Sequence, residues 1–199
     1  MRPSQFIAEL KLVCVHWKQR FLMHFADLLP MAHWNYFRKV KNSTYRRLGM
    51  RIDEPVFIDV GFKCIRPDNI QIENNVSLGH DNHIWAFFPV RIGHHTFTAK
   101  DLLVLAGSHD VGSFVPTDGQ EVEIGPGCWI GTRVTILGGA KIGKGCVIGA
   151  GSVVRGTIPD FSVAAGVPAK VIRQREPSDP VWNQFASYPL SEIGGPSAL

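Results

Sequence analysis

The residue whose chemistry stands out first is His109, in the tetrapeptide Gly107-Ser108-His109-Asp110. An imidazole titrates near neutral pH, so it can take the proton of a hydroxyl group as that oxygen attacks another atom. Asp110 follows directly, and it either orients the imidazole ring or only begins the next loop. We predict that His109 is a general base. The alternative is a polar residue at a backbone corner, without a chemical role.

Metal binding is another use of histidine, because His80, His83, His94 and His95 also occur in this region. A catalytic zinc ion needs three protein ligands that converge on one point. These histidines form one pair three residues apart and one adjacent pair, and the four cysteines show no CxxC spacing. The sequence therefore predicts no metal site.

The segments that position His109 have a side-chain pattern that repeats every six residues. In the second half of the chain the aliphatic positions are Ile124, Ile130, Ile136, Ile142, Ile148 and Val154. The first half follows the same phase more loosely, through Val60, Ile72, Leu78 and Ile84. After a two-residue slip the repeat resumes at Ile92 and reaches Val104. This period fits short strands joined at repeated corners, whose stacked coils bury one aliphatic column. We predict an all-β solenoid at residues 56–175, with a loop at 110–123 where the period breaks.

Two cysteines occupy equivalent positions in the repeat. Cys128 and Cys146 are separated by three six-residue steps, and both take the small inward position that follows each aliphatic residue. If three six-residue sides make one coil, the two cysteines stack about 4.8 Å apart. A disulfide is conceivable at that spacing. In a reducing compartment we interpret both residues as small hydrophobic side chains.

Residues 1–55 are predicted to be partly helical. Apolar side chains recur with a period near 3.6 over residues 5–29, Pro30 ends the pattern, and residues 31–50 are basic and aromatic. The helix either packs on its own domain or on a sister subunit, or it lies on an acidic membrane surface. Residues 176–199 are expected to form an irregular tail.

Composition and charge narrow the function classes. A chain of 199 residues holds one buried domain plus an appendage, and a net charge of +4 is too mild to indicate nucleic-acid binding. Glu9, Lys11 and Lys18 interrupt any apolar run near the N-terminus, so no export signal is predicted. No stretch reaches the length of a membrane span. We expect a cytoplasmic protein, with peripheral contact at the inner face of the membrane as one option.

The repeat, closed by the segment AAGVPAKVIR at residues 164–173, resembles the galactoside and maltose acetyltransferase family of hexapeptide acyltransferases. The resemblance extends over residues 56–175. It implies a left-handed parallel β-helix of triangular section, a homotrimer, and acetyl-CoA bound between neighbouring subunits. It also implies O-acetyl transfer to a hydroxyl group, with His109 as the base.

The same resemblance implies a set of cofactor-binding residues. They are Trp129, Thr132, Ala150, Arg155, Gly156, Lys170 and Arg173. Trp129 would lie beside the reactive end of CoA, or else pack on a neighbouring subunit. The small residues would let pantetheine approach the backbone, and the cations could meet CoA phosphates. The family has arginine in place of Lys170 and threonine–lysine in place of Arg155-Gly156, so positive charge is redistributed here.

The acceptor side departs from the family. Its sugar-binding asparagine and aspartate align with Gly79 and Phe87, which cannot make the same contacts. We predict acceptor binding by the neighbouring residues His80, Asp81, Asn82, His83 and Trp85. The aromatic side chains here either stack on a sugar ring or fill a trimer interface. The acceptor is therefore expected to be a different sugar or glycan, such as a cell-envelope polysaccharide or a lipid-linked glycan.

Three other functions stay open. A serine-type O-acetyltransferase carries a long helical N-terminal domain, for which residues 1–55 are short. A metal-dependent enzyme of the carbonic-anhydrase type needs a histidine followed, after a long gap, by a pair five residues apart. An inactive scaffold would need only the repeat, whereas this chain also has His109, Trp129 and the cationic closing segment.

Overall fold

The computed structural model describes residues 21–23, 25–26 and 35–176. Most of the predicted helix at residues 5–29 lies outside these ranges, and the five residues described within it are helical. The predicted tail also lies outside the described residues, apart from Glu176.

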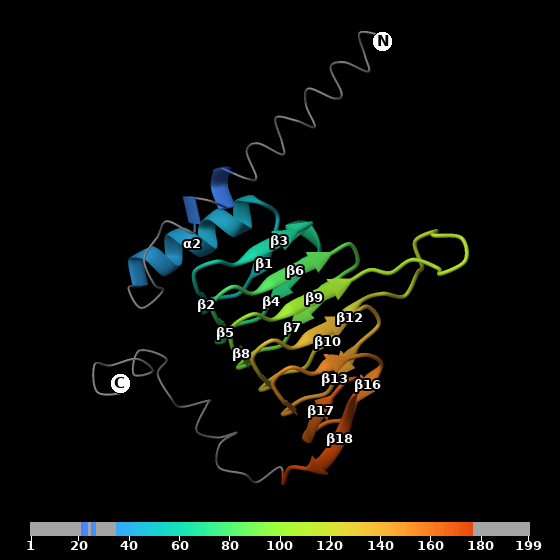
Figure 1. Ribbon diagram of the computed structural model, residues 1–199. Helices are drawn as coiled ribbons and strands as arrows, with labels where there is room; N and C mark the ends of the chain where they lie inside the picture. Colours follow the sequence, from blue (N-terminus) through green and yellow to red (C-terminus); the bar gives the residue numbers. More distant parts are fainter. Residues whose placement is uncertain (1–20, 24, 27–34, 177–199) are drawn as a thin grey trace, which may run out of the picture.

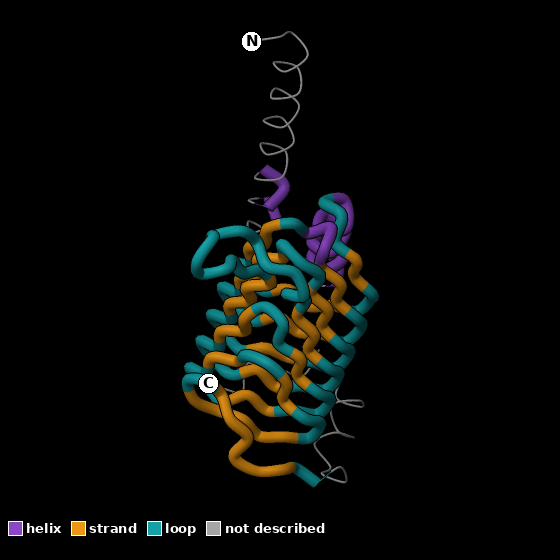
Figure 2. The backbone as a smooth tube through the Cα atoms, turned by 90° about the vertical axis from the view of Figure 1, so that its right-hand side faces the viewer, coloured by secondary structure: helices purple, strands orange, loops and turns teal. Residues whose placement is uncertain are grey.

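From residue 51 the chain winds into a parallel β-solenoid with three sheets, which confirms the predicted fold (Figures 1 and 2). Sheet A contains β1 (Arg51–Ile52), β4 (Ile70–Ile72), β7 (Val90–Ile92), β10 (Val122–Ile124), β13 (Lys141–Ile142) and β16 (Thr157–Ile158). Sheet B contains β2 (Val56–Ile58), β5 (Val76–Leu78), β8 (Phe97–Thr98), β11 (Trp129–Ile130), β14 (Val147–Ile148), β17 (Ser162–Gly166) and the antiparallel β18 (Ala169–Gln174). Sheet C contains β3 (Lys63–Ile65), β6 (His83–Ala86), β9 (Leu103–Ala106), β12 (Thr135–Leu137) and β15 (Val153–Val154).

Each coil runs through sheets A, B and C in turn, so the section is triangular, with an A–B, a B–C and a C–A edge. Inward side chains fill the section: Ile124, Ile130 and Ile136 are fully buried. Trp129 pairs in register with Val147, which follows it by three six-residue sides, as one regular coil requires. Cys128 and Cys146, which precede these partners, are buried free thiols, in agreement with their interpretation as small core side chains.

Coil length varies, and all of the variation falls at the C–A edge. Successive coils are marked by the sheet A partners Arg51, Gln71, Arg91, Glu123, Lys141 and Thr157. The coil that contains the loop after β9 is the longest, and the coil from β13 to β16 is the shortest. Across the A–B and B–C edges, successive inward residues stay six residues apart, as at Ile92, Thr98 and Val104. Insertions collected at one edge of a solenoid commonly build its functional surface.

This edge explains one wrong prediction. The six-residue phase places Val60 in the aliphatic column, whereas Ile58 occupies that position and Val60 lies half-buried at the B–C edge. The first C–A corner contains the short 3₁₀ helix η1 (Pro67–Asn69). The corner is two residues longer than a regular one, so the phase slips before Ile72.

Helix α2 (Asn35–Arg47) covers the β1–β3 end of the solenoid (Figure 1). Its buried face is polar, because the backbone carbonyl groups of the first coil lack a preceding coil to pair with. Side chains of α2 donate hydrogen bonds to four of these carbonyls. The pairs are Arg46 with Ile52 at 2.8 Å, Asn42 with Val56 at 2.9 Å, Lys41 with Asp59 at 2.8 Å and Tyr45 with Phe62 at 3.4 Å.

Candidate active site

His109 lies on the C–A edge, at the base of the loop that joins β9 to β10 and projects from the body (Figure 1). An antiparallel bridge between His109 and Pro116 closes this base, and the amide of Thr117 donates to the carbonyl of Ser108 at 3.0 Å. The imidazole is exposed, and no described residue forms a hydrogen bond or ion pair with it. The closed loop base therefore holds the backbone of His109 while its side chain is exposed to solvent.

Asp110 acts as the first residue of the loop rather than as a partner of the His109 ring. Its carboxylate accepts hydrogen bonds from the Ser113 amide at 2.8 Å, the Ser113 hydroxyl at 2.8 Å and the Gly112 amide at 3.1 Å. These bonds lower the pKa of Asp110. Of the two roles predicted for Asp110, this conformation shows the beginning of the loop.

Two exposed aromatic side chains lie beside the base of the loop. A Cβ added at Gly107 would lie 3.2 Å from the Phe87 ring, so this ring packs against the backbone two residues before His109. Phe87 is 55% exposed, and Trp85 on β6 is 42% exposed. Trp85 is paired in register with Leu105 on β9. The C–A edge thus combines the imidazole with an aromatic and aliphatic surface.

The other predicted acceptor residues lie elsewhere on the second coil. The Nε2 atom of His80 lies 2.9 Å from a carboxylate oxygen of Asp59, and Asp81 takes a left-handed φ of 56° at the same B–C corner. Asn82 is fully buried, where its amide bonds to Thr98 and accepts from the Leu102 amide. Because its side chain is buried and bonded within the coil, Asn82 is not part of the proposed acceptor site. His83 begins β6, in register with Leu103.

Trp129 lies outward on sheet B, 49% exposed, as its place in the repeat predicts. Its ring stacks on Phe97 of the preceding coil, with centroids 5.8 Å apart and planes at 23°. Our sequence analysis missed Phe97, although the period could have found it: Phe97 follows Ile92 by five residues, as Trp129 follows Ile124. The registers extend this outward column through Val147 to Val163 and Arg173.

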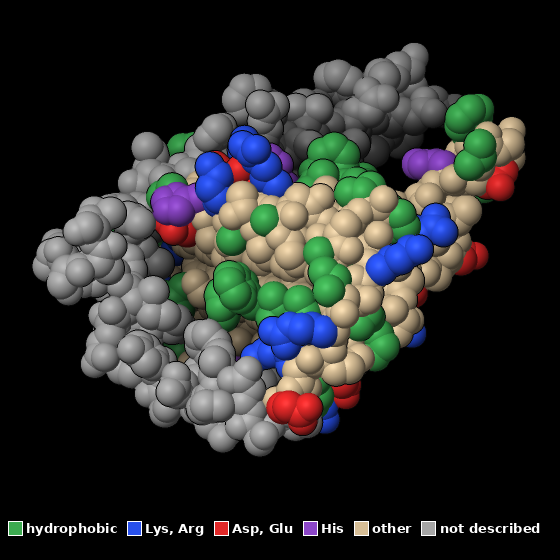
Figure 3. Space-filling view, turned by 60° about the horizontal axis from the view of Figure 1, so that its bottom comes forward, with side chains coloured by type: hydrophobic (Ala, Val, Ile, Leu, Met, Phe, Trp, Pro, Cys, Tyr) green, Lys and Arg blue, Asp and Glu red, His purple; other side chains and the backbone are tan. Residues whose placement is uncertain are grey.

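Thr132 and Ala150 lie on the B–C edge, one coil apart. A Cβ at Gly131 would lie 2.7 Å from the Ala150 amide nitrogen, so these corners stack with their backbones close together. Lys170 on β18 pairs with Ala165 near the same edge. The surface combines small corners with cations. The view toward the C-terminal end of the solenoid shows Lys and Arg side chains among hydrophobic ones (Figure 3).

Comparison with known proteins identifies this architecture. The family model for bacterial transferase hexapeptide (six repeats) matches residues 121–156. A putative acetyltransferase of Saccharomyces cerevisiae is 36% identical over 149 residues, which are 73% of this chain and 76% of the yeast protein. The chain belongs to the hexapeptide-repeat acetyltransferases.

Two bacterial relatives extend well beyond the region that matches this chain. A probable acetyltransferase of Mycobacterium tuberculosis is 38% identical over 60% of this chain and 41% of its own length. A putative lipopolysaccharide biosynthesis O-acetyltransferase of Escherichia coli is 36% identical over 59% of this chain and 63% of its own. This chain thus covers less than two thirds of either protein.

Solved structures agree with the fold of this chain. A maltose O-acetyltransferase from Clostridium difficile superposes with a TM-score of 0.72 at 26% identity, over 83% of this chain and 88% of the other. A galactoside acetyltransferase in complex with coenzyme A superposes with a TM-score of 0.63 at 23% identity, over 82% of each chain.

Within one chain ten candidate residues form two groups, which leave out Asp110 in the loop and His80, Asp81, Asn82 and His83 on the second coil. At or beside the C–A edge lie Trp85, Phe87, His109, Arg155 and Gly156. On sheet B and the B–C edge lie Trp129, Thr132, Ala150, Lys170 and Arg173. In a triangular section the C–A edge lies opposite sheet B. One chain therefore does not bring His109 to Trp129.

The described residues include neither a cluster of metal ligands nor a helix that could span a membrane. No group of three or more histidine, cysteine, aspartate or glutamate side chains there is arranged to hold a metal ion. In the same ranges, every helix is too short or too polar to span a bilayer.

Proposed function

We propose that this acetyltransferase moves the acetyl group of acetyl-CoA to a hydroxyl group of a sugar or glycan, with His109 as general base. The observation that carries the proposal is the exposed imidazole of His109, held on a closed loop base beside Phe87 and Trp85. Aromatic faces and aliphatic groups suit the apolar face of a sugar ring. The sugar assignment is supported by relatives whose names specify lipopolysaccharide biosynthesis and maltose.

The chemistry asked of His109 is proton transfer in both directions. The imidazole takes the proton of the acceptor hydroxyl as its oxygen forms a bond to the thioester carbonyl carbon. When the tetrahedral intermediate collapses, the carbon–sulfur bond breaks and the imidazolium can return the proton to the thiolate of CoA. The products are an acetyl ester and free CoA.

The sheet B group is proposed to bind the donor. Thr132 and Ala150 lie at corners whose backbones stack closely. Because the side chains at these corners are small, a pantetheine arm could approach the backbone there. Lys170 and Arg173 are exposed cations suited to phosphate groups. Trp129, fixed by its stack on Phe97, offers an apolar surface near the thioester. The coenzyme A in the galactoside acetyltransferase structure supports this choice of donor.

We further propose that a complete site forms between two subunits of a homotrimer. His109 with Arg155 and Gly156 would come from the C–A edge of one chain, and the Trp129 group from sheet B of the next. A cyclic arrangement supplies three such contacts and closes. The exposed Trp129 and Trp85 supply apolar surface for the contact. The predicted cytoplasmic location is retained as part of this proposal.

The test follows release of free CoA thiol from acetyl-CoA in the presence of sugars, glycan fragments and serine. We expect release that depends on a sugar or glycan and falls at least ~100-fold in His109→Ala. His95→Asn, which removes a histidine from the A–B edge, is the matched control and should retain activity. Acceptor-dependent release that survives in His109→Ala would exclude His109 as the base. Failure to bind acetyl-CoA would exclude the proposed reaction.

A further inference from the structure

The solvent face of α2 is strongly cationic. Its exposed positions follow one stripe along the helix, at Tyr36, Lys39, Arg46 and Arg47, and Tyr36 is 73% exposed. The helix sequence NYFRKVKNSTYRR contains no acidic residue. Arg46 lies at the border of this stripe, since its guanidinium also donates to the carbonyl of Ile52. Tyr36, Lys39 and Arg47 lie on the side that α2 presents to solvent.

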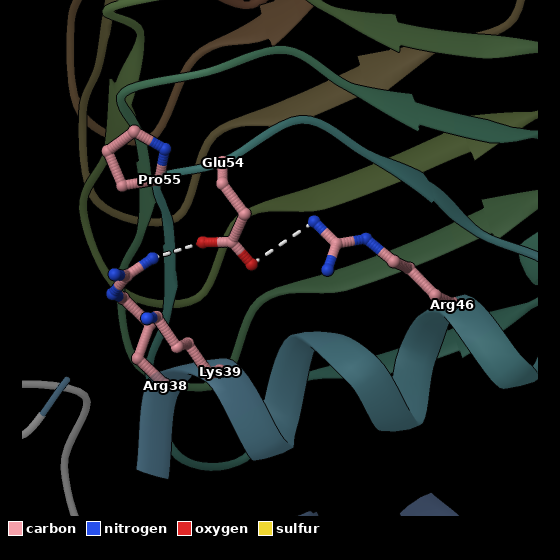
Figure 4. Close-up of a pocket in the computed structure, with 5 residues that line it drawn as sticks. All are labelled: Arg38, Lys39, Arg46, Glu54 and Pro55. Carbon is pink, nitrogen blue, oxygen red and sulfur yellow. Dashed lines mark hydrogen bonds and ion pairs between the residues drawn. The ribbon is translucent and has the colours of Figure 1, made fainter. Parts of the chain in front are cut away.

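A pocket of about 500 Å³ opens between α2 and the turn after β1 (Figure 4). It is lined by Arg38, Lys39, Arg46, Glu54 and Pro55. Glu54 lies between the two guanidinium groups, paired with Arg38 on one side and with Arg46 at 3.1 Å on the other. Two arginines thus share one carboxylate, and the exposed Lys39, which also lines the pocket, has no ion-pair partner among the described residues. This excess of positive charge suits an anion such as a phosphate group.

Exposed aromatic residues lie at the same end of the solenoid. The helical residues 21–23 and 25–26 lie with α2 at the β1–β3 end of the solenoid (Figures 1 and 2). Met23 and Ala26 pack against the core, while Phe21 and Phe25, four residues apart, are 70% and 42% exposed. Phenylalanine and tyrosine beside lysine and arginine are typical of surfaces that rest in the headgroup region of a bilayer.

We propose that this end of the solenoid docks on an anionic phospholipid bilayer, with a lipid phosphate entering the pocket of Arg38, Lys39 and Arg46. A free phosphate could satisfy the cations, but it gives no role to Phe21, Phe25 and Tyr36, whose exposure costs free energy in water. The bilayer accounts for both kinds of side chain. The proposal does not depend on the acetyltransferase reaction.

The test is flotation of the full chain with vesicles of phosphatidylcholine alone or mixed equally with phosphatidylglycerol. We expect binding to the mixed vesicles, weakened by salt, and little binding to the neutral ones. Lys39→Glu should lower the vesicle partition coefficient about 5-fold or more. Lys141→Glu, the same change on the exposed face of sheet A, is the matched control and should bind like the parent chain.

Three outcomes would overturn the proposal. The first is equal binding to neutral and mixed vesicles, and the second is an equal loss in Lys39→Glu and Lys141→Glu, because neither depends on the pocket. The third is stabilisation of the folded chain by millimolar inorganic phosphate, lost in Lys39→Glu, without any flotation. That result would assign the pocket to a soluble phosphate instead. Circular dichroism of each variant verifies folding.

Discussion

At the scale of single residues, His109 and Phe87 are joined through the backbone at Gly107. The Phe87 ring packs against that glycine, two residues before His109, and we propose that it borders the acceptor space in front of the imidazole. If this space receives a sugar ring, Phe87 acts on the acceptor and not on the donor. The two substrates can therefore be separated kinetically.

We expect Phe87→Ala to lower kcat/KM for the acceptor about tenfold, because a stacking surface is lost. The KM for acetyl-CoA should stay near that of the parent enzyme. Phe87→Tyr retains the ring and should restore most of the activity. Steady-state kinetics with each substrate varied in turn makes the measurement. Equal changes in both KM values would indicate a general distortion of the loop base.

A second prediction concerns His94 and His95, whose Nδ1 atoms lie 2.9 Å apart on the A–B edge. Burial, followed by the charge of His94, lowers the pKa of His95. His95 therefore binds a proton more weakly in the folded chain than in the unfolded chain. Stability contributed by the neutral ring is therefore present above the ordinary histidine pKa of about 6.5, and is lost as the pH falls toward the lowered value.

His95→Asn removes this titration while asparagine tolerates the left-handed φ of 55°. We expect the Tm of the parent chain to fall more steeply than that of His95→Asn between about pH 8 and about pH 5. Thermal unfolding followed by circular dichroism gives both curves. Parallel curves would show that this histidine pair does not couple to folding.

At the scale of elements, α2 covers the first coil, and the polar side chains on its buried face form hydrogen bonds with that coil. Asn42 is fully buried and donates to the carbonyl of Val56 at 2.9 Å and to Glu54 at 3.1 Å. Unpaired carbonyls at the end of a sheet are costly when covered without donors. The polar face of α2 therefore supplies hydrogen-bond donors to the first coil, as each coil supplies them to the coil next to it.

Asn42→Ala should lower the free energy of unfolding by about 1–3 kcal/mol, because it leaves a buried carbonyl without its donor. Ser43→Ala, on the neighbouring and more exposed position of α2, should change it by less than about 0.5 kcal/mol. Urea unfolding of the two variants compares them directly. A similar small loss in both would mean that water replaces the missing donor.

At the scale of the whole molecule, the C–A edge collects every change in coil length, and sheet B faces the opposite way. The residues proposed for the base and for the donor are divided between these two sides. Activity should therefore belong to contacts between chains. Variants that disable different sides can be combined in one assembly.

We expect His109→Ala and Trp129→Ala to be weakly active when each is prepared separately. After unfolding and joint refolding in equal amounts, about one quarter of the contacts would combine an intact His109 with an intact Trp129. Acetyl transfer should then recover toward one quarter of the parent activity. Activity no higher than the average of the separate variants would place both residues in a single-chain site.

The sequence by itself determined the solenoid, its inward column and the position of the loop after β9. Those features depend on a local six-residue step, since each coil repeats the same corner and buries the same side of each strand. The step also predicted that Cys128 and Cys146 are stacked core residues and that Trp129 faces outward. It did not predict the two-residue slip before Ile72, because that slip depends on how an irregular corner packs. The burial of Asn82 does follow from the step, since Asn82 comes four residues after Leu78 as Cys128 comes four residues after Ile124, and our sequence analysis missed it.

Only the tertiary structure decided what covers the ends and which outward residues meet. The helix period at residues 5–29 depends on apolar side chains, whereas α2 buries a polar face, so hydrophobic periodicity does not reveal it. The stack of Trp129 on Phe97 joins two coils that the long loop after β9 separates in the sequence. The division of the candidate site between the C–A edge and sheet B likewise follows from the triangular section, in which residues close in sequence are turned to opposite faces.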